Sequence, residues 1–315
     1  MEWLEALVLG LVQGLTEFLP VSSDGHLTVT QQIFAGLKGY SRSGKENLFF
    51  NVVLHIGTLV AILVYYRSVV MTGIKGFLGS EEVAPAYRRQ ALIRLGILVG
   101  LTIVPLVPWK FFKDKLESTL EDPLYSGIGF LITATVLFIT SRLKGGDKGP
   151  LQTTFLDAFL IGCAQTLAPL PGVSRSGMTC AMALALGLNR AWAVGFSLMI
   201  AVPAILGAEV LEIKDVDRST LSPDRIGQAI AGTLVAGLVG YGAIIWLVKI
   251  VRNGKLWYFS LYLVLIAAIV LGARLTMGKD KLVPKEKDAP AETSTPTEAA
   301  SLLRPEFRKP YLTRN

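Results

Sequence analysis

The side chains best suited to chemistry lie in two short polar segments of an otherwise apolar chain. The first, Val21–His26, places two hydroxyls, a carboxylate, a glycine and an imidazole within six residues. Ser22 or Ser23 could act as a nucleophile and His26 as an acid or base, while the glycine lets backbone N–H groups approach an anion. Glu17 precedes the segment by about one helical turn. A serine-rich turn that only caps a helix is the alternative.

The second segment, Pro171–Thr179, carries an arginine among serines and glycines. An arginine between apolar spans is costly unless it holds an anion, and the planar guanidinium of Arg175 suits two phosphate oxygens at once. Ser174, Ser176 and nearby backbone N–H groups could complete an anion-binding nest at the start of the next helix. Two alternatives stay open: Arg175 could extend to the membrane interface, or it could pair with a structural acid such as Glu17.

The two segments belong to an internal duplication. Leu9–His26 and Ile161–Met178 align without a gap and share identical residues at Gly10/Gly162, Gln13/Gln165, Leu15/Leu167, Val21/Val173, Ser22/Ser174 and Gly25/Gly177. Both copies put proline, glycine and charge within apolar surroundings, where they are expensive unless they line a cavity. We therefore expect the duplicated element to form the active centre.

Composition identifies a polytopic membrane protein. Of the 315 residues, 51% are apolar and 17% are charged, and the mean hydropathy is +0.50. The net charge of +7 comes from basic clusters between apolar runs, as the positive-inside rule produces, so nucleic-acid binding is not expected. Cys163 and Cys180 lie in an apolar stretch and are interpreted as packing residues.

The predicted fold is an all-α integral membrane protein with six transmembrane helices and two re-entrant helical hairpins. The hairpins are the two duplicated segments, because each has only about a dozen apolar residues before its proline. The six predicted spans are Leu48–Tyr66, Ala91–Trp109, Pro123–Ser141, Ala191–Val210, Ile226–Ile250 and Trp257–Arg274.

The halves of the chain are predicted to be inverted in the membrane. Basic connections such as Arg67–Arg94 should be cytoplasmic, and one hairpin plus three spans per half then gives opposite topologies. We expect one membrane domain, 1–277, with halves of about 1–145 and 146–277, and both termini outside. Lysines that follow the last span, such as Lys279, disagree with this orientation, because it places these basic residues outside. The segment 278–315 is rich in Lys, Glu, Pro, Thr and Ala and is predicted to be disordered.

Other polar residues within the apolar runs are interpreted as structural. His55 in the first span is expected to be a hydrogen-bonded packing residue outside the site. Glu209 and Lys249 lie near the ends of predicted spans and are interpreted as interface residues.

The two motifs together resemble those of the bacterial undecaprenyl-diphosphate phosphatases of the BacA/UppP type. The early motif is QGLTEFLPVSSDGH, the central one is PGVSRSGMT, and the resemblance covers about Met1–Met277. It implies an integral membrane phosphoric anhydride hydrolase that removes one phosphate from undecaprenyl diphosphate and returns the lipid carrier to cell-wall synthesis, with associated bacitracin resistance. It also implies a multi-pass protein of the bacterial inner membrane with its active site open to the periplasmic side.

The resemblance also assigns expected roles to residues. The family's (Glu/Gln)-x-x-x-Glu motif falls on Gln13 and Glu17, and its essential histidine falls on His26. The family depends on a divalent metal, Mg²⁺ or Ca²⁺, for which Glu17 is the expected ligand; a glutamine at position 13 argues against a site with two carboxylates there. The residues expected to bind substrate are Gln13, Ser22, Gly172, Ser174, Ser176 and Thr179.

As a mechanism we expect Ser23 to attack the terminal phosphorus, with His26 orienting or deprotonating it, Arg175 holding the diphosphate, and Glu17 holding His26 or the metal. Direct attack by a metal-bound water is the rival scheme. Inverted repeats also build secondary transporters, so a transporter or lipid flippase for a phosphorylated substrate is the alternative function. Expected partners are the polyprenyl diphosphate and membrane lipids; the oligomeric state is open, with a homodimer as one option.

Overall fold

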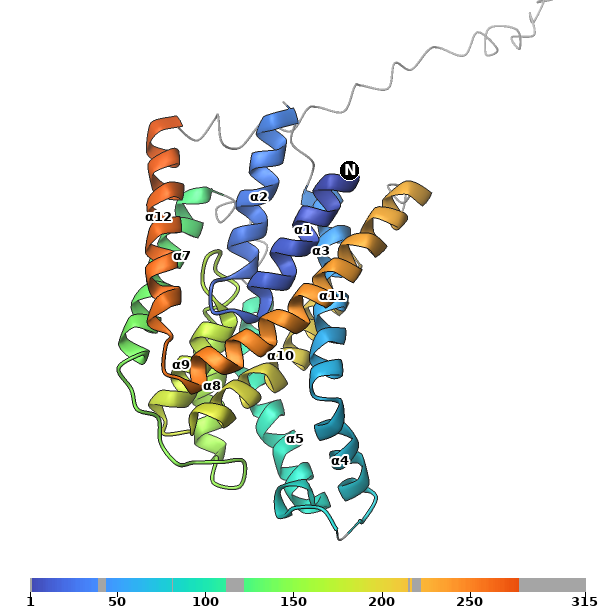
Figure 1. Ribbon diagram of the computed structural model, residues 1–315, viewed down its shortest axis with the longest axis vertical. Helices are drawn as coiled ribbons and strands as arrows, with labels where there is room; N and C mark the ends of the chain where they lie inside the picture. The colour runs from blue at the N-terminus through green and yellow to red at the C-terminus, as the bar shows by residue number, and fades with distance from the viewer. Residues whose placement is uncertain are drawn as a thin grey trace, which may run out of the picture.

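The computed structural model describes residues 2–38, 44–80, 82–111, 122–214, 216 and 222–277. These residues confirm the all-α prediction (Figure 1). The elements in chain order are α1 (Trp3–Phe18), α2 (Ser23–Lys38), α3 (Gly44–Tyr65), α4 (Arg67–Phe77), η1 (Pro85–Tyr87), α5 (Arg89–Ile103), η2 (Val104–Phe111), α7 (Pro123–Thr140), α8 (Phe155–Gln165), α9 (Arg175–Ala185), α10 (Arg190–Glu212), α11 (Pro223–Arg252) and α12 (Trp257–Met277). The predicted disordered tail, 278–315, lies outside the described residues.

Six of these helices are long and apolar enough to cross a membrane. They match the six predicted spans within a few residues and cover Leu48–Tyr65, Arg89–Trp109, Pro123–Thr140, Arg190–Glu212, Pro223–Arg252 and Trp257–Thr276. Large apolar side chains remain on their outer faces; Leu238 of α11 is 77% exposed. Such faces are stable against lipid, which supports a multi-pass membrane protein.

Two segments differ in detail from the prediction. The span that starts at Arg89 changes from α-helix to 3₁₀-helix at Val104, where prolines at 105 and 108 cannot donate backbone hydrogen bonds. The basic connection after the first span contains a helix of its own, α4. Its apolar residues Val70, Ile74 and Phe77 recur at helical spacing, a pattern that favours a helix over an irregular loop.

Each duplicated segment forms a pair of helices with a polar turn between them, α1–α2 in one copy and α8–α9 in the other. In Figure 1, α1 and α2 lie in the upper part of the molecule and α8 and α9 in the lower part, with the two turns near the middle. This arrangement fits two hairpins that approach from opposite sides. That each pair enters and leaves the membrane on one side stays a prediction, as does the boundary near residue 145.

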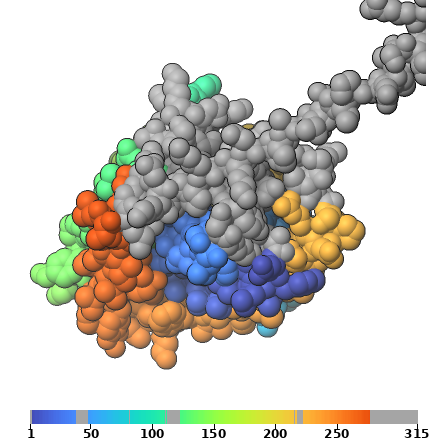
Figure 2. Space-filling model, turned by 90° about the horizontal axis from the view of Figure 1, so that it is seen from above, coloured from blue at the N-terminus to red at the C-terminus, as the bar shows by residue number. Residues whose placement is uncertain are grey.

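The two halves exchange packing partners. Helix α1 of the first half packs on α11 of the second, and α8 of the second half packs on α5 of the first. The duplicated glycines permit both approaches: a Cβ atom on Gly10 would lie 2.3 Å from the Gly232 carbonyl oxygen, and one on Gly162 would lie 2.7 Å from that of Thr102. Viewed from above, Figure 2 shows α1 and α2 between α12 and the first part of α11.

Candidate active site

Both polar turns are built on the same backbone device. In each copy a serine precedes a helix and accepts a hydrogen bond from the backbone N–H three residues later: Gly25 N to Ser22 Oγ at 3.3 Å, and Gly177 N to Ser174 Oγ at 3.1 Å. These serines cap the helices α2 and α9. Ser22 and Ser174 are thus capping residues, which leaves the next residue of each copy free to face the site; a further role of either serine in substrate binding stays a prediction.

The turns hold unusual backbone conformations. Ser22 has a φ of 71°, which residues other than glycine rarely adopt, and Gly172 has a φ of 82°. Thr133 of α7 braces the second turn, since its hydroxyl donates to the Gly172 carbonyl and accepts from the Ser174 N–H, both at 3.0 Å. Strain of this kind persists where the surrounding structure enforces it, commonly at functional sites.

The two turns meet, as the sequence predicted. The Ser176 hydroxyl donates to the Leu19 carbonyl at 3.2 Å, and Arg175 Nη2 lies 2.6 Å from Glu17 Oε1. The Arg175 side chain is 15% exposed and that of Glu17 is 4% exposed, so the ion pair lies largely out of solvent. Pairing with Glu17, one of the alternatives left open for Arg175, is thus present in the structure.

Glu17 is the centre of the contacts. Its Oε2 atom accepts from Ser23 Oγ at 2.7 Å and from Gln13 Nε2 at 3.1 Å, and it lies 3.5 Å from His55 Nε2. Its Oε1 atom accepts from Arg175. A carboxylate with this many donors is held in one orientation, and it can receive a proton from the Ser23 hydroxyl.

The Arg175 guanidinium keeps one nitrogen available. Nη2 binds Glu17, whereas Nη1 is buried and has no hydrogen-bond partner among the described residues. A buried guanidinium N–H without an acceptor is costly, so an anionic ligand is its natural partner. This observation favours anion binding beside Ser23.

His26 is engaged differently from the expectation. Its Nδ1 atom lies 2.7 Å from the Ser22 carbonyl and its Nε2 atom lies 2.8 Å from the Tyr262 hydroxyl. The ring therefore donates from Nδ1 and accepts from Tyr262 at Nε2, and it also contacts the Phe130 ring edge-on. Both nitrogens are occupied without Ser23, because the side chain reaches back along α2 to the preceding turn. In this geometry Glu17, and not His26, is the hydrogen-bond acceptor of Ser23.

Comparison with known proteins decides the family. A family model described as bacitracin resistance protein BacA matches residues 6–269, which include both polar turns. This chain belongs to the BacA family. Similar proteins named undecaprenyl-diphosphatase occur in Carboxydothermus hydrogenoformans, 42% identical over 85% of this chain and 95% of that protein; in Desulfatibacillum aliphaticivorans, 36% over 87% and 99%; and in Nocardioides sp., 37% over 86% and 96%.

The remaining expected substrate residues of this BacA-family protein brace the turns. Thr179 Oγ1 lies 2.6 Å from Ser197 Oγ, and Ser174 and Ser176 share a hydroxyl contact at 3.2 Å. Gln13 holds Glu17, and its own Oε1 is buried without a hydrogen-bond partner among the described residues. These contacts place the residues around the site; their role in substrate binding stays a prediction.

Three residues beside the site were not expected there. His55 of α3 contacts Glu17, Glu209 of α10 contacts His55, and Tyr262 of α12 holds His26. The expectation that His55 lies outside the site is therefore wrong, whereas the interpretation of Glu209 as an interface residue stays a prediction. The sequence signal was present, since an ionisable residue within a membrane span is a functional hypothesis by default. Tyr262 gave no such signal, because tyrosines are common near membrane interfaces.

The described residues do not by themselves form a complete metal site in this BacA-family protein, and Glu17 as a metal ligand stays a prediction. Among the described residues, no group of three or more His, Cys, Asp and Glu side chains is arranged to hold a metal ion. Glu17, the expected ligand, already accepts hydrogen bonds on both oxygens, and its neighbour at position 13 is an amide. Protein side chains alone thus offer too few free oxygens for Mg²⁺ or Ca²⁺.

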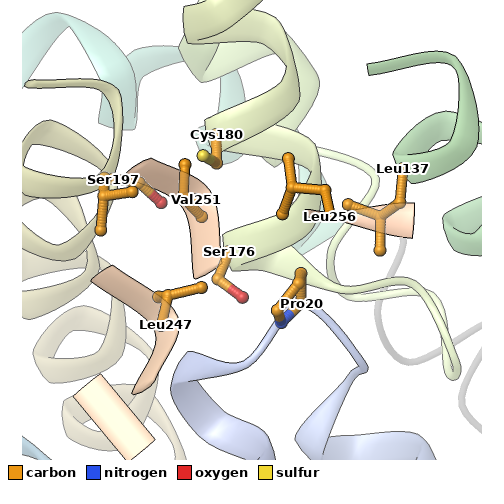
Figure 3. Close-up of a pocket in the computed structure, with 9 residues that line it drawn as sticks. Pro20, Leu137, Ser176, Cys180, Ser197, Leu247, Val251 and Leu256 are labelled. Carbon is orange, nitrogen blue, oxygen red and sulfur yellow. The ribbon is translucent and has the colours of Figure 1, made fainter. Parts of the chain in front are cut away.

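A small cavity lies beside the junction of the turns, between Pro20 of the first and Ser176 of the second (Figure 3). Its volume is about 10 Å³, and Ser197 and Cys180 also line it. That volume suits about one water molecule and not a diphosphate. The cavity is therefore part of the packing around the two turns.

Proposed function

We propose that this protein hydrolyses undecaprenyl diphosphate to undecaprenyl phosphate and inorganic phosphate. One observation carries the proposal: a hydroxyl nucleophile, Ser23, and an anion-binding side chain, Arg175, both bind the same buried carboxylate, Glu17, within a bundle of membrane helices. The names of the similar proteins support the substrate. The product would return to cell-wall synthesis as the lipid carrier, and abundant enzyme would give bacitracin resistance.

In the proposed reaction, Ser23 Oγ attacks the terminal phosphorus and its proton passes to Glu17 Oε2, 2.7 Å away. The bond between that phosphorus and the bridging oxygen breaks, and the lipid monophosphate leaves with the electron pair. Water then attacks the phosphoserine and loses a proton to a phosphoryl oxygen, while the bond between Ser23 Oγ and phosphorus breaks. Ser23 takes back the proton held by Glu17, and phosphate is released. The arriving diphosphate takes the free Nη1 atom of Arg175, which stabilises charge on the transferred phosphoryl group.

His26 is proposed to act on the other side of the phosphoryl group. Its ring is fixed by Ser22 and Tyr262, on the same helix as Ser23 and about one turn further on. From there it can orient the substrate or exchange a proton once the Tyr262 contact opens. Direct attack by water, with Ser23 as a binding group, remains the rival scheme.

We propose that the divalent cation enters the site bound to the phosphates of the substrate. Mg²⁺ in phosphoryl-transfer sites is commonly bound by substrate phosphates together with one or two carboxylates, and the diphosphate brings the oxygens that the protein lacks. We also propose that the site opens to the periplasmic side of the bacterial inner membrane. A homodimer stays an untested prediction.

The decisive experiment is phosphate release from purified protein in detergent, with long and short polyprenyl diphosphates and with or without a chelator. Release in detergent supports a hydrolase, since a transporter or flippase has no gradient or second compartment there. Ser23→Ala should abolish release, while Ser141→Ala, at the end of α7 and outside the site, should not. Normal turnover by Ser23→Ala would contradict the covalent scheme, and a phosphoserine trapped at position 23 would support it.

A further inference from the structure

We propose that His55 and Glu209 form a positioning pair that holds the Glu17 carboxylate at Oε2, the oxygen that Arg175 does not bind. The inference rests on the proposed function, because it gives Glu17 a part in the reaction. It concerns two residues from different halves of the repeat, on α3 and α10. Neither residue belongs to the two polar turns.

The geometry of the His55 ring carries the proposal. On one edge, Nε2 lies 3.5 Å from Glu17 Oε2. On the other edge, Nδ1 lies 3.1 Å from Glu209 Oε1 and 2.8 Å from the Asn51 carbonyl oxygen. All of these partners are oxygen acceptors, and the Nδ1 atom donates its hydrogen bond to the Asn51 carbonyl. The ring lies between the carboxylates of Glu17 and Glu209 as an ion-pair partner of both and thus connects α1, α3 and α10.

Burial makes this arrangement expensive. The side chains of Glu17, Glu209 and His55 are 4%, 12% and 14% exposed. Glu209 Oε2 is buried and has no hydrogen-bond partner among the described residues. A glutamate with one unpaired oxygen destabilises a membrane helix, whereas an apolar residue at the same position would not. A role in the site therefore explains Glu209 better than packing does.

The pair acts on Glu17 through its orientation. Ser23 and Gln13 bind Oε2 from α2 and α1, and Arg175 binds Oε1 from α9. His55 approaches the same Oε2 atom from α3, so rotation of the carboxylate would break its contacts with several helices at once. Glu209 in turn keeps the imidazole turned toward Glu17. His55 and Glu209 are therefore positioning residues, which reach the substrate only through Glu17.

The test compares five variants by phosphate release, with kcat and KM measured separately and the melting temperature as a folding control. We expect His55→Ala to lower kcat by about 100-fold with little change in KM, since misplacement of a catalytic group by about 1 Å has that effect. His55→Gln can still donate to Glu17 and should restore most of kcat. Glu209→Met should lower kcat by about tenfold and leave the melting temperature unchanged or raised, because it removes an unsatisfied acid.

The control is Asp224→Asn, which removes one negative charge from an exposed position in the first turn of α11. It should keep kcat within about twofold of wild type; an equal loss in Glu209→Met and Asp224→Asn would overturn the contact model in favour of general electrostatics. Adding Glu209→Met to His55→Ala should cost nothing more if Glu209 acts through His55. The proposal would be overturned if the losses of kcat in the two single variants add in the double variant, or if Glu209→Met has a normal kcat. Glu209→Met still tests the proposal if His55→Ala does not fold.

The outcomes separate this inference from the proposed function. If His55→Ala is fully active while Ser23→Ala and Glu17→Gln are inactive, the positioning pair is wrong and the hydrolase stands. If wild-type protein releases no phosphate from any polyprenyl diphosphate, both are wrong.

Discussion

The two copies of the duplicated segment share their backbone and differ in their charges. Ser22 and Ser174 cap the following helices through equivalent hydrogen bonds, and Gly10 and Gly162 each allow close contact with a helix of the other half. The next position differs, with Ser23 in the first copy and an arginine in the second. Duplication thus supplied a symmetrical frame on which one site could be assembled from unlike parts.

The charges show why both copies are needed. Glu17 of the first copy aligns with Pro169 of the second, and His26 aligns with Met178. Helix α1 runs on to Phe18 and carries the acid within its last turn, whereas α8 ends at Gln165 before two prolines. The first copy therefore supplies Ser23 and the Glu17 carboxylate, and the second copy supplies Arg175.

Glu17→Gln should have the largest effect. It removes the proton acceptor of Ser23 and the partner of Arg175 together, and we expect phosphate release to fall by about 10⁴-fold, the upper end of the range for acid–base groups. Glu17→Asp keeps the charge on a shorter side chain and should retain more activity. Equal activity of Glu17→Gln and wild type would show that the first copy contributes no base.

Arg175→Lys should come next. Lysine keeps the charge but has a single nitrogen, whereas the planar guanidinium can bind Glu17 through one nitrogen and a phosphate oxygen through another. We therefore expect a loss of about 10²- to 10³-fold in kcat. The measurement is steady-state phosphate release. Undiminished activity would show that the second copy supplies only positive charge.

The duplicated glycines should differ in their tolerance of a methyl group. Gly10→Ala brings a Cβ atom to 2.3 Å from a backbone oxygen, compared with 2.7 Å for Gly162→Ala, so the first should destabilise the protein more, by about 1–3 kcal/mol. Gly242→Ala on α11 meets no atom within 4 Å and is the matched control, with unchanged or higher stability. Thermal unfolding in detergent measures all three. Equal losses at all three glycines would contradict the close-packing model.

Substitution of the two capping serines should change stability least, and glycine variants should distinguish the two positions. Ser22→Ala and Ser174→Ala each lose a cap and should lower stability by about 1 kcal/mol. Glycine should separate them, because it relieves the positive φ of 71° at position 22 but has no such advantage at position 174, where φ is −83°. We therefore expect Ser22→Gly to be more stable than Ser22→Ala. A reversed order would mean that the first turn is not strained.

Much of the site could be predicted because duplication and apolar context are properties of the sequence itself. Both polar turns, the choice of Glu17, Ser23 and Arg175 as candidate residues, and the six spans follow from residue type, spacing and hydropathy. The partner of His26 could not be predicted in this way. Its ring turns toward Tyr262, 236 residues away, and the choice depends on how α12 packs beside α2 and α7.

The sequence by itself determined a six-span helical membrane protein with two polar turns in duplicate, because apolar length and repeated motifs need no knowledge of distant neighbours. Only the tertiary structure decided which groups meet. The contact of Glu17 with Arg175 and with His55, and of His55 with Glu209, joins α1 to α9, α3 and α10. Hydrogen bonds and ion pairs act over a few ångströms, and the fold alone brings these distant residues within that range.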